Sequence, residues 1–227
     1  QKATQYVGDH LANLGLDVEY HTWQTNQPPN VIGELPGSSN PDDILIICGH
    51  LDSITYNTPM TLAPGADDNA SGSVAVLTAA DIMTQYDWSC TLRFALWTGE
   101  EQGLLGSNVY AQRSYNLGEN ILGVLNLDMI AWNTLGSART IDLNANQSVV
   151  GSVPLAQLFA DVLAAYGIDL IPEIKPNGSG ASDHASFWQF GYPAILGIED
   201  FGDFNPYYHS EDDLLEYLDV PYYTDFV

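Results

Sequence analysis

The sequence predicts an α/β fold: a single domain with a mostly parallel, mixed central sheet and helices on both faces. Segments with strand patterns alternate along the chain with segments long enough for helices, the order that produces a parallel sheet between helices. Residues 44–48 are continuously apolar, as expected for a strand covered on both faces. With 227 residues and 45% hydrophobic content, the chain can bury one large core.

Each element is predicted from the spacing of its apolar residues and from the residues that bound it. Residues 2–14 carry apolar side chains at helical spacing and stop at Gly15. A Thr-, Pro- and Asn-rich loop at 53–65 precedes a mostly apolar segment, 70–86, that is long enough for a buried helix. The same criteria place strands at 17–23, 30–35, 91–98, 121–127, 138–143, 168–173 and 193–198, and further helices at 102–114, 153–166, 183–190 and from 220 onward. We expect a few antiparallel strands at one edge of the sheet.

The chain contains no linker-like run and no internal repeat, so we expect residues 1–227 to form one domain. Residues 1–14 start in mid-helix and residues 220–227 resemble the opening of a helix, which predicts a chain cut at both ends. We also expect a secreted or extracellular protein. Because no signal peptide is present, this would require that one was removed.

The charge of the chain excludes some partners. Five basic residues stand against 29 acidic ones, for a net charge of -24. Nucleic acids and anionic membranes are therefore not expected as partners, and no stretch approaches the roughly 20 apolar residues of a membrane span. Most of the acidic residues are expected on the solvated surface. We expect a monomer.

The usual nucleophiles are poorly represented. No Gly-x-Ser-x-Gly motif occurs, and neither cysteine has a neighbouring histidine that would suggest a thiolate pair. Cys48 and Cys90 both lie beside predicted strands, where they could form a disulfide or remain two free thiols.

Acids and histidines follow several predicted strands. His50 follows the strand at 44–48, the Glu100-Glu101 pair follows 91–98, and Asp128 ends 121–127. Open α/β sheets build their sites at the carboxyl ends of strands. With a further histidine, His209, in a late loop, these residues supply the nitrogen and oxygen ligands that a pair of zinc ions needs. This inventory predicts a metal-dependent hydrolase.

Each motif also has a simpler interpretation. Asp67 and Asp68 could cap the helix that follows them, but buried anions need a cation, and the chain has few Lys or Arg residues. The Glu100-Glu101 pair could simply begin the next helix. If a metal is present, one of the two can bind it while the other takes a proton from bound water.

The remaining histidines are assigned by their surroundings. His50 and Asp52 lie two apart, on the same side of an extended segment, so the Asp can accept the second ring N–H of the histidine. A hydrogen-bonded loop histidine near a capping Asp is the alternative. We assign His10 and His21 to the surface.

Six segments between about residues 30 and 213 together resemble the zinc aminopeptidases of the bacterial leucyl aminopeptidase type, in the family of co-catalytic two-zinc exopeptidases. They are Gly-His-Leu-Asp-Ser, Pro-Gly-Ala-Asp-Asp-Asn-Ala-Ser-Gly, Gly-Glu-Glu-Gln-Gly, Leu-Asn-Leu-Asp-Met, Ser-Asp-His-Ala-Ser-Phe and Tyr-His-Ser-Glu-Asp. The resemblance implies two zinc ions. By position, His50 and Asp128 would bind one ion, Glu101 and His209 would bind the other, and Asp68 would bridge them.

The resemblance also assigns residues that bind no metal. Glu100 would be the general base, Asp52 the partner of His50, and His184 a structural residue. Some relatives stabilise the tetrahedral intermediate with a Tyr between two cysteines before Ser-Asp-His, where this chain has Ser179 and no cysteine. Other relatives use a Tyr directly before the last histidine ligand. Tyr208 matches that position, and we favour it for this role.

The implied reaction is hydrolysis of the amino-terminal peptide bond of a peptide with a free amino terminus. A carboxypeptidase would need a cation for the substrate carboxylate, but Arg93 lies inside a predicted strand and Arg113 near a helix end. An acidic site suits the substrate ammonium, for which Glu199 or Asp200 is a candidate partner.

Aromatic residues around 187–188 and 201–208 predict an apolar pocket for the first side chain, favouring Leu-like or aromatic residues. The alternatives are a glutaminyl-cyclase-like transferase, a carboxypeptidase on the same scaffold, and a non-catalytic binding module.

Overall fold

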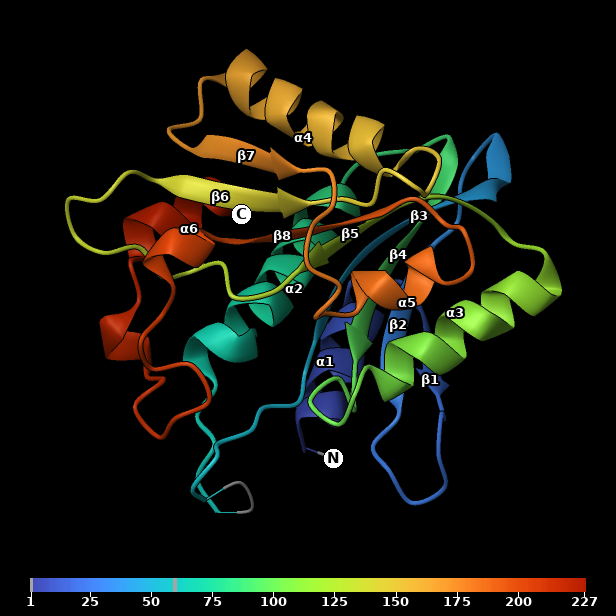
Figure 1. Cartoon of the computed structure of the whole chain (residues 1–227). Helices are drawn as coiled ribbons and strands as arrows, with labels where there is room; N and C mark the ends of the chain where they lie inside the picture. The colour runs from blue at the N-terminus through green and yellow to red at the C-terminus, as the bar shows by residue number, and fades with distance from the viewer. Residues whose placement is uncertain (1, 59–60) are drawn as a thin grey trace.

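The structure is a computed structural model that describes residues 2–58 and 61–227. In the described residues, one eight-stranded sheet is surrounded by helices (Figure 1). The strands are β1 Asp17–His21, β2 Asn30–Leu35, β3 Asn40–His50, β4 Cys90–Trp97, β5 Asn120–Leu127, β6 Thr140–Asn144, β7 Ile171–Lys175 and β8 Ala194–Glu199. The helices are α1 Lys2–Asn13, α2 Gly72–Met83, α3 Leu105–Leu117, α4 Ser152–Tyr166, α5 His184–Trp188 and α6 Val220–Phe226. Short helical turns are η1 Ala66–Ser71, η2 Phe201–Asp203 and η3 Leu215–Tyr217.

The strand order is β1-β2-β4-β3-β5-β8-β6-β7. The four central strands β4, β3, β5 and β8 are parallel to one another. Antiparallel pairings lie on both sides of this centre, β2 with β4 and β6 with β8. The predicted mixed, mostly parallel sheet is confirmed, whereas the expectation that antiparallel strands occur at only one edge is wrong.

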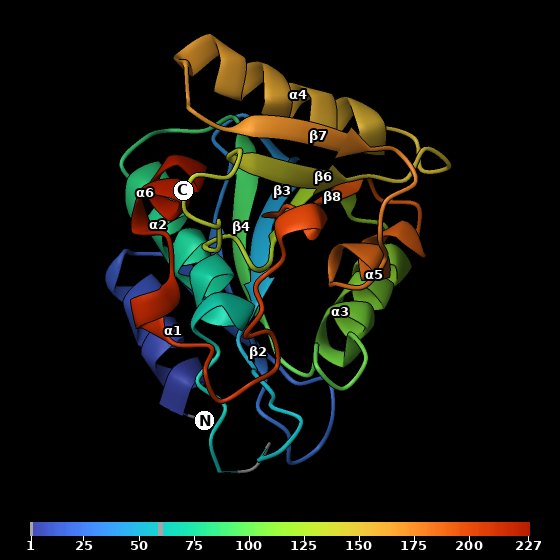
Figure 2. The ribbon, with the colours of Figure 1, turned by 60° about the vertical axis from the view of Figure 1, so that its left-hand side comes forward.

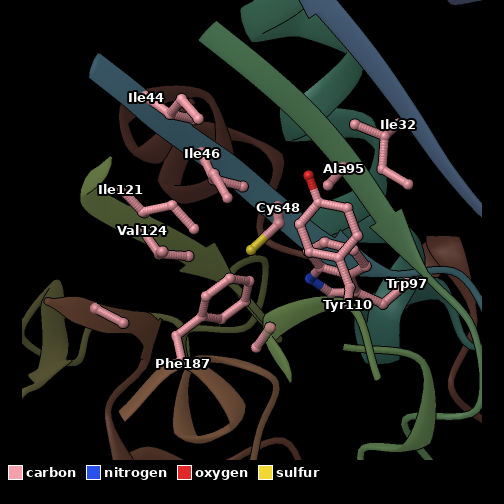
Figure 3. Close-up of a cluster of buried hydrophobic side chains, with 12 residues drawn as sticks. Ile32, Ile44, Ile46, Cys48, Ala95, Trp97, Tyr110, Ile121, Val124 and Phe187 are labelled. Atoms are coloured by element: carbon pink, nitrogen blue, oxygen red, sulfur yellow. The ribbon is translucent and has the colours of Figure 1, made fainter. Parts of the chain in front are cut away.

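Alternate residues of β3 enter different cores. Ile44, Ile46 and Cys48 of β3 pack with residues of α3 and α5, as Figure 3 shows. Leu45 and Ile47 of the same strand pack on the other face, with residues of α1 and α2. The core under α4 and α6 also includes Ile47, so these helices share that second face. In Figure 2 the two layers lie on opposite sides of the sheet.

Two helices begin later than predicted because special turns precede them. Gly103 and Leu104 donate their N–H groups to the carbonyl of Glu100, and Leu104 itself has a left-handed φ of 58°. This turn delays α3 to Leu105, although the prediction began at residue 102. The irregular turn η1 similarly precedes α2. Both turns carry acids of the site, so the chain departs from a regular helix where its acidic residues are presented.

Cys48 and Cys90 are free thiols. The surface assignment of His21 is wrong, because the residue is only 8% exposed. Its Nδ1 lies 3.1 Å from the amide nitrogen of Asn30, and its ring makes a T-shaped contact with the ring of Tyr110. His21 ends β1 on the side that α3 covers. Among the described residues, no helix is both long and apolar enough to cross a membrane.

Candidate metal centre

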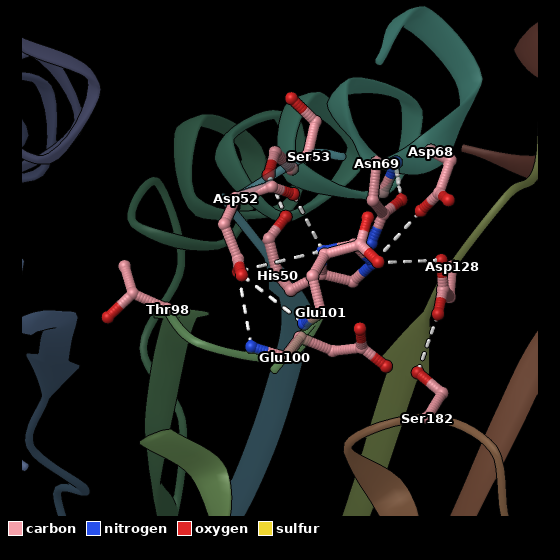
Figure 4. A network of polar contacts seen from close by, with 12 residues as sticks. His50, Asp52, Ser53, Asp68, Asn69, Thr98, Glu100, Glu101, Asp128 and Ser182 are labelled. Atoms are coloured by element: carbon pink, nitrogen blue, oxygen red, sulfur yellow. Dashed lines mark hydrogen bonds and ion pairs between the residues drawn. The ribbon is translucent and has the colours of Figure 1, made fainter. Parts of the chain in front are cut away.

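The carboxyl ends of the central parallel strands lie at one edge of the sheet, and the predicted ligands meet there. His50 ends β3, Asp128 follows β5, and Glu101 lies in the turn after β4 (Figure 4). Asp68 comes from η1, and His209 comes from the loop before η3. All five side chains are buried or nearly buried.

Asp68 lies at the middle of this group. One of its carboxylate oxygens is 3.2 Å from Nε2 of His50, and the other is 3.0 Å from Nε2 of His209. Each histidine also has an acid of its own. Nε2 of His50 is 3.2 Å from Asp128, and Nε2 of His209 is 3.1 Å from Glu101. The geometry is therefore two His–acid pairs joined by one shared carboxylate.

The donor set fits divalent metal ions. Single ligand atoms of His50, Asp68 and Glu101 lie within 4.8 Å of one another, as do those of His50, Glu100 and Asp128. One oxygen of Glu101 is buried and has no hydrogen-bond partner among the described residues. Imidazole nitrogens combined with carboxylate oxygens are ligands that zinc accepts.

Without metal, protons must neutralise the cluster. Burial alone would lower the pKa of His209, but Asp68 and Glu101 outweigh it and raise that pKa to about 10. Burial likewise opposes the charge on His50, yet Asp128 and Asp68 hold its pKa well above the ordinary value. Burial would raise the pKa of Asp68, but hydrogen bonds from the two histidines lower it to about 2. The metal-free site thus holds charged histidines where cations would bind.

These shifts predict how the stability of the metal-free protein depends on pH. His209 is expected to stabilise the fold fully below its unfolded pKa of about 6.5 and to lose this effect as pH rises toward about 10. Burial raises the pKa of Glu100 from its ordinary value of 4.5 to about 9. Between these two values the unfolded state releases this proton while the folded state keeps it, so the stability contributed by Glu100 also falls as pH rises from about 4.5 to about 9. The thermal unfolding midpoint of the metal-free protein should therefore fall from pH 6.5 to pH 9.5.

Zinc-loaded protein is the control for that measurement. Metal ligands must be deprotonated to bind, so the stabilisation gained on adding zinc should grow as pH rises. A metal-free midpoint that increases between pH 6.5 and 9.5 would contradict the protonation states assigned to the site.

Asp52 supports the site differently from the prediction. Nδ1 of His50 donates to the backbone carbonyl of Asp52 at 2.9 Å, whereas the Asp52 carboxylate is 3.9 Å from the ring. That carboxylate instead accepts from the backbone N–H groups of Glu100 and Glu101, at 3.3 and 3.2 Å. Asp52 therefore leaves Nε2 of His50 free for a metal and holds the turn that carries both glutamates.

Other supporting residues were not predicted from the sequence. The hydroxyl of Ser182 donates to the second oxygen of Asp128 at 2.6 Å and accepts from the amide of Asn126 at 2.8 Å. The only sequence signal for Ser182 is its place beside the Asp-His pair of its motif. His184 is fully buried, and its Nε2 contacts the carbonyl of Ser179 at 2.8 Å. It lies outside the ligand contacts, in agreement with the structural assignment.

A small pocket of about 80 Å³ opens onto the site. It is lined by His50, Asp68, Glu100, Asp128, Met129, Ser179, Ala181, Leu196, Ile198, Phe201, Phe204, Tyr208 and His209. A larger cavity of about 350 Å³, lined in part by Trp23 and Asp52, contains none of the five ligands. The smaller pocket joins apolar walls to the site.

Half of the aromatic prediction is wrong. Phe187 is fully buried in the core, 5.9 Å from the ring of Trp97, because α5 turns this side toward the sheet. The indole nitrogen of Trp188 donates to the carbonyl of Ala194. Phe201 and Tyr208, from the second predicted aromatic segment, do line the pocket.

Comparison with known proteins agrees with this geometry. Residues 30–226 match the model of peptidase family M28. A probable leucine aminopeptidase of Trichophyton verrucosum (strain HKI 0517) is 37% identical over 201 residues, which cover 84% of this chain and 52% of the relative. Another, of Arthroderma benhamiae (strain ATCC MYA-4681 / CBS 112371), is 31% identical over 222 residues, 95% of this chain and 58% of the relative. The chain thus spans about half the length of the curated relatives that it matches.

Solved structures share the fold. The LapA aminopeptidase of Legionella pneumophila superposes with a TM-score of 0.84 at 22% identity, over 99% of this chain and 62% of that one. A glutaminyl cyclase of Bacteroides thetaiotaomicron superposes with a TM-score of 0.75 at 18% identity, over 97% and 84%. The family resemblance predicted from the six motifs is confirmed, and the chain belongs to peptidase family M28.

Proposed function

We propose that the chain is the catalytic unit of a two-zinc aminopeptidase, which hydrolyses the first peptide bond of peptides with a free amino terminus and prefers apolar first residues. The observation that carries this proposal is the shared carboxylate of Asp68, which contacts His50 through one oxygen and His209 through the other. A bridging acid between two complete His–acid pairs suits two ions better than one.

The residues around the ligands suit peptide hydrolysis. When bound, the two zinc ions would lower the pKa of a water and polarise the scissile carbonyl. Glu100 would take the proton of the attacking water and pass it to the leaving amine. Burial and the acids of the site raise the pKa of Tyr208, so its hydroxyl stays protonated. Tyr208 lines the pocket and would donate a hydrogen bond to the oxyanion.

The placement of the cations favours an aminopeptidase over a carboxypeptidase. Arg93 pairs with Glu34 and Glu119, and Arg113 pairs with Glu19. Arg139 and Lys175 are likewise paired with acids. Among the described residues, no Lys or Arg lines the pocket. In the described part of the chain, the pocket therefore offers several acids to a substrate ammonium and no Lys or Arg to a substrate carboxylate.

The predicted ammonium partner needs correction. Glu199 is fully buried, and its oxygens accept from the backbone N–H groups of Asn205 and Trp132. It therefore cannot reach a substrate. Asp200 accepts from the N–H of Gly202 at the start of η2. Asp200 therefore stays a candidate for contact with the ammonium, and the acids next to the metal centre other than the general base Glu100 add to the negative potential that attracts it.

The pocket walls suit an apolar first side chain. Met129, Leu196, Ile198, Phe201 and Phe204 line the pocket together with the site residues. An apolar pocket of this kind favours Leu-like residues, since each buried CH₂ contributes about 0.8 kcal/mol.

The glutaminyl-cyclase-like alternative rests on the shared fold alone. Five ligand-type side chains, two His–acid pairs and the shared Asp68, favour the peptidase, and they also argue against a non-catalytic binding module. We also propose that the protein is secreted and monomeric.

Exopeptidase polarity is tested with matched leucyl peptides that carry either a free or an acetylated amino terminus. The free peptide should be cut by the zinc-loaded protein, and the acetylated one should not, because acetylation removes the charge that the acidic site attracts. Product analysis by mass spectrometry decides. Equal cleavage of both peptides, or release of residues from the carboxyl end, would refute the aminopeptidase assignment while leaving the metal site intact.

A further inference from the structure

The carboxylate of Asp213 joins two segments that carry ligands. Asp213 lies in the same loop as His209 and is 3% exposed. Its Oδ1 accepts from the backbone N–H of Asp67 at 3.0 Å, and its Oδ2 accepts from the N–H of Asp68 at 3.0 Å. Its backbone carbonyl accepts from the N–H of Ala66 at 3.1 Å. Three successive N–H groups of η1 are thus held by one residue of the His209 loop.

The backbone of η1 explains why an acid is needed there. Asp68 and Asn69 have non-helical dihedral angles, with φ of −107° and −135°. The N–H groups at the start of such a turn have no carbonyl partner within it, and buried N–H groups without partners cost stability. Only an ionised carboxylate offers acceptors at both of its ends. An Asn in place of Asp213 would turn an NH₂ group toward one of these N–H groups.

The two halves of the metal centre are supported differently. His50 and Asp128 extend from β3 and β5, whose pairing in the sheet sets their separation. His209 and Asp68 come from irregular segments, and their contact of 3.0 Å depends on how those segments are joined. The Asp213 carboxylate connects these two segments directly through its hydrogen bonds to η1.

We propose that Asp213 is a positioning residue that holds Asp68 against His209 and so sets the affinity for the zinc ion bound by Glu101 and His209. This inference rests on the proposed two-zinc function. In the described residues, the hydrogen bonds from η1 to the Asp213 carboxylate come from the backbone N–H groups of Asp67 and Asp68, and the side-chain oxygens of Asp68 face the two histidines instead.

The test compares Asp213→Asn with Asp212→Asn. Asp212 is the exposed neighbour in the same loop, and its substitution removes the same charge without touching η1. Zinc binding to the metal-free proteins is measured by calorimetry. Asp213→Asn should weaken binding of the zinc ion held by Glu101 and His209 by about 10–100-fold, as is typical when a supporting partner is removed. Asp212→Asn should leave the affinities for both ions unchanged. Activity of Asp213→Asn should recover as free zinc is raised, which would not occur for a damaged fold.

The outcomes separate this inference from the function on which it rests. If the wild type binds no zinc, the proposed function fails, and this inference fails with it. If the wild type binds two ions and Asp213→Asn binds both equally well, or if Asp212→Asn weakens binding as much, only the positioning role is refuted.

A measurement on the wild type covers the case in which Asp213→Asn does not fold. Hydrogen exchange of the metal-free protein should show protected amides at residues 66–68. Exchange there as fast as in exposed loops would overturn the proposal.

Discussion

Replacing Glu100 by Gln is expected to leave both zinc ions bound and to reduce kcat at least about 100-fold, the scale of a lost general base. The substitution keeps the size of the side chain and removes its ability to take a proton. In the metal-free protein, burial and neighbouring acids raise the pKa of Glu100 to about 9. Nearby dications favour the charged form of a carboxyl, so Glu100 becomes an effective base only when the site is loaded.

Zinc content, measured by elemental analysis together with kcat, distinguishes the proposed base Glu100 from the proposed ligand Glu101. The matched variant Glu101→Gln removes the proposed ligand that contacts His209 at 3.1 Å, and it should lose metal and activity together. If Glu100→Gln loses zinc and Glu101→Gln keeps it, the roles of the pair are reversed.

Replacing Asp68 by Asn should have the largest effect on metal content. Asp68 is the shared acid of both histidines, so an amide at this position removes a charged ligand from both ions at once. Its NH₂ group cannot coordinate a metal. We expect zinc affinity to fall by more than the roughly 100-fold upper range for a supporting residue, with activity lost in parallel.

Asp52→Asn provides the comparison for Asp68→Asn. Asp52 holds the turn of Glu100 and Glu101 by accepting from their backbone N–H groups. Its substitution should therefore lower zinc affinity by only about 10–100-fold. The zinc retained after dialysis against buffers of set free-zinc concentration gives the zinc affinity of each variant. An Asp68→Asn protein that keeps two ions as tightly as Asp52→Asn would show that Asp68 does not bridge.

That the predicted ligand residues lie close together could be foreseen from the sequence because of a simple property of the fold. Parallel strands end at the same edge, so an acid or histidine placed directly after an apolar strand is carried to a shared site. His50 and Asp128 follow this rule closely. Asp68 and His209 lie outside the strands, and only the order of the motifs connected them to the site.

The supporting contacts could not be predicted in the same way. Ser182 and Asp213 act by donating to, or accepting from, groups on distant segments, and these bonds leave no periodic pattern in the sequence. The late start of α3 depends on the left-handed φ of Leu104, which propensity does not indicate. Phe187 belongs to an aromatic segment, but only the packing of α5 decides that it faces the core.

A crystal structure of the protein grown with zinc, with anomalous diffraction measured at the zinc edge, tests the two-zinc centre most directly. The two-zinc assignment predicts two anomalous peaks, one next to His50 and Asp128 and the other next to Glu101 and His209, with Asp68 in contact with both. A map with no peak within bonding distance of these side chains, or with a peak bound by His184 in place of His209, would contradict it.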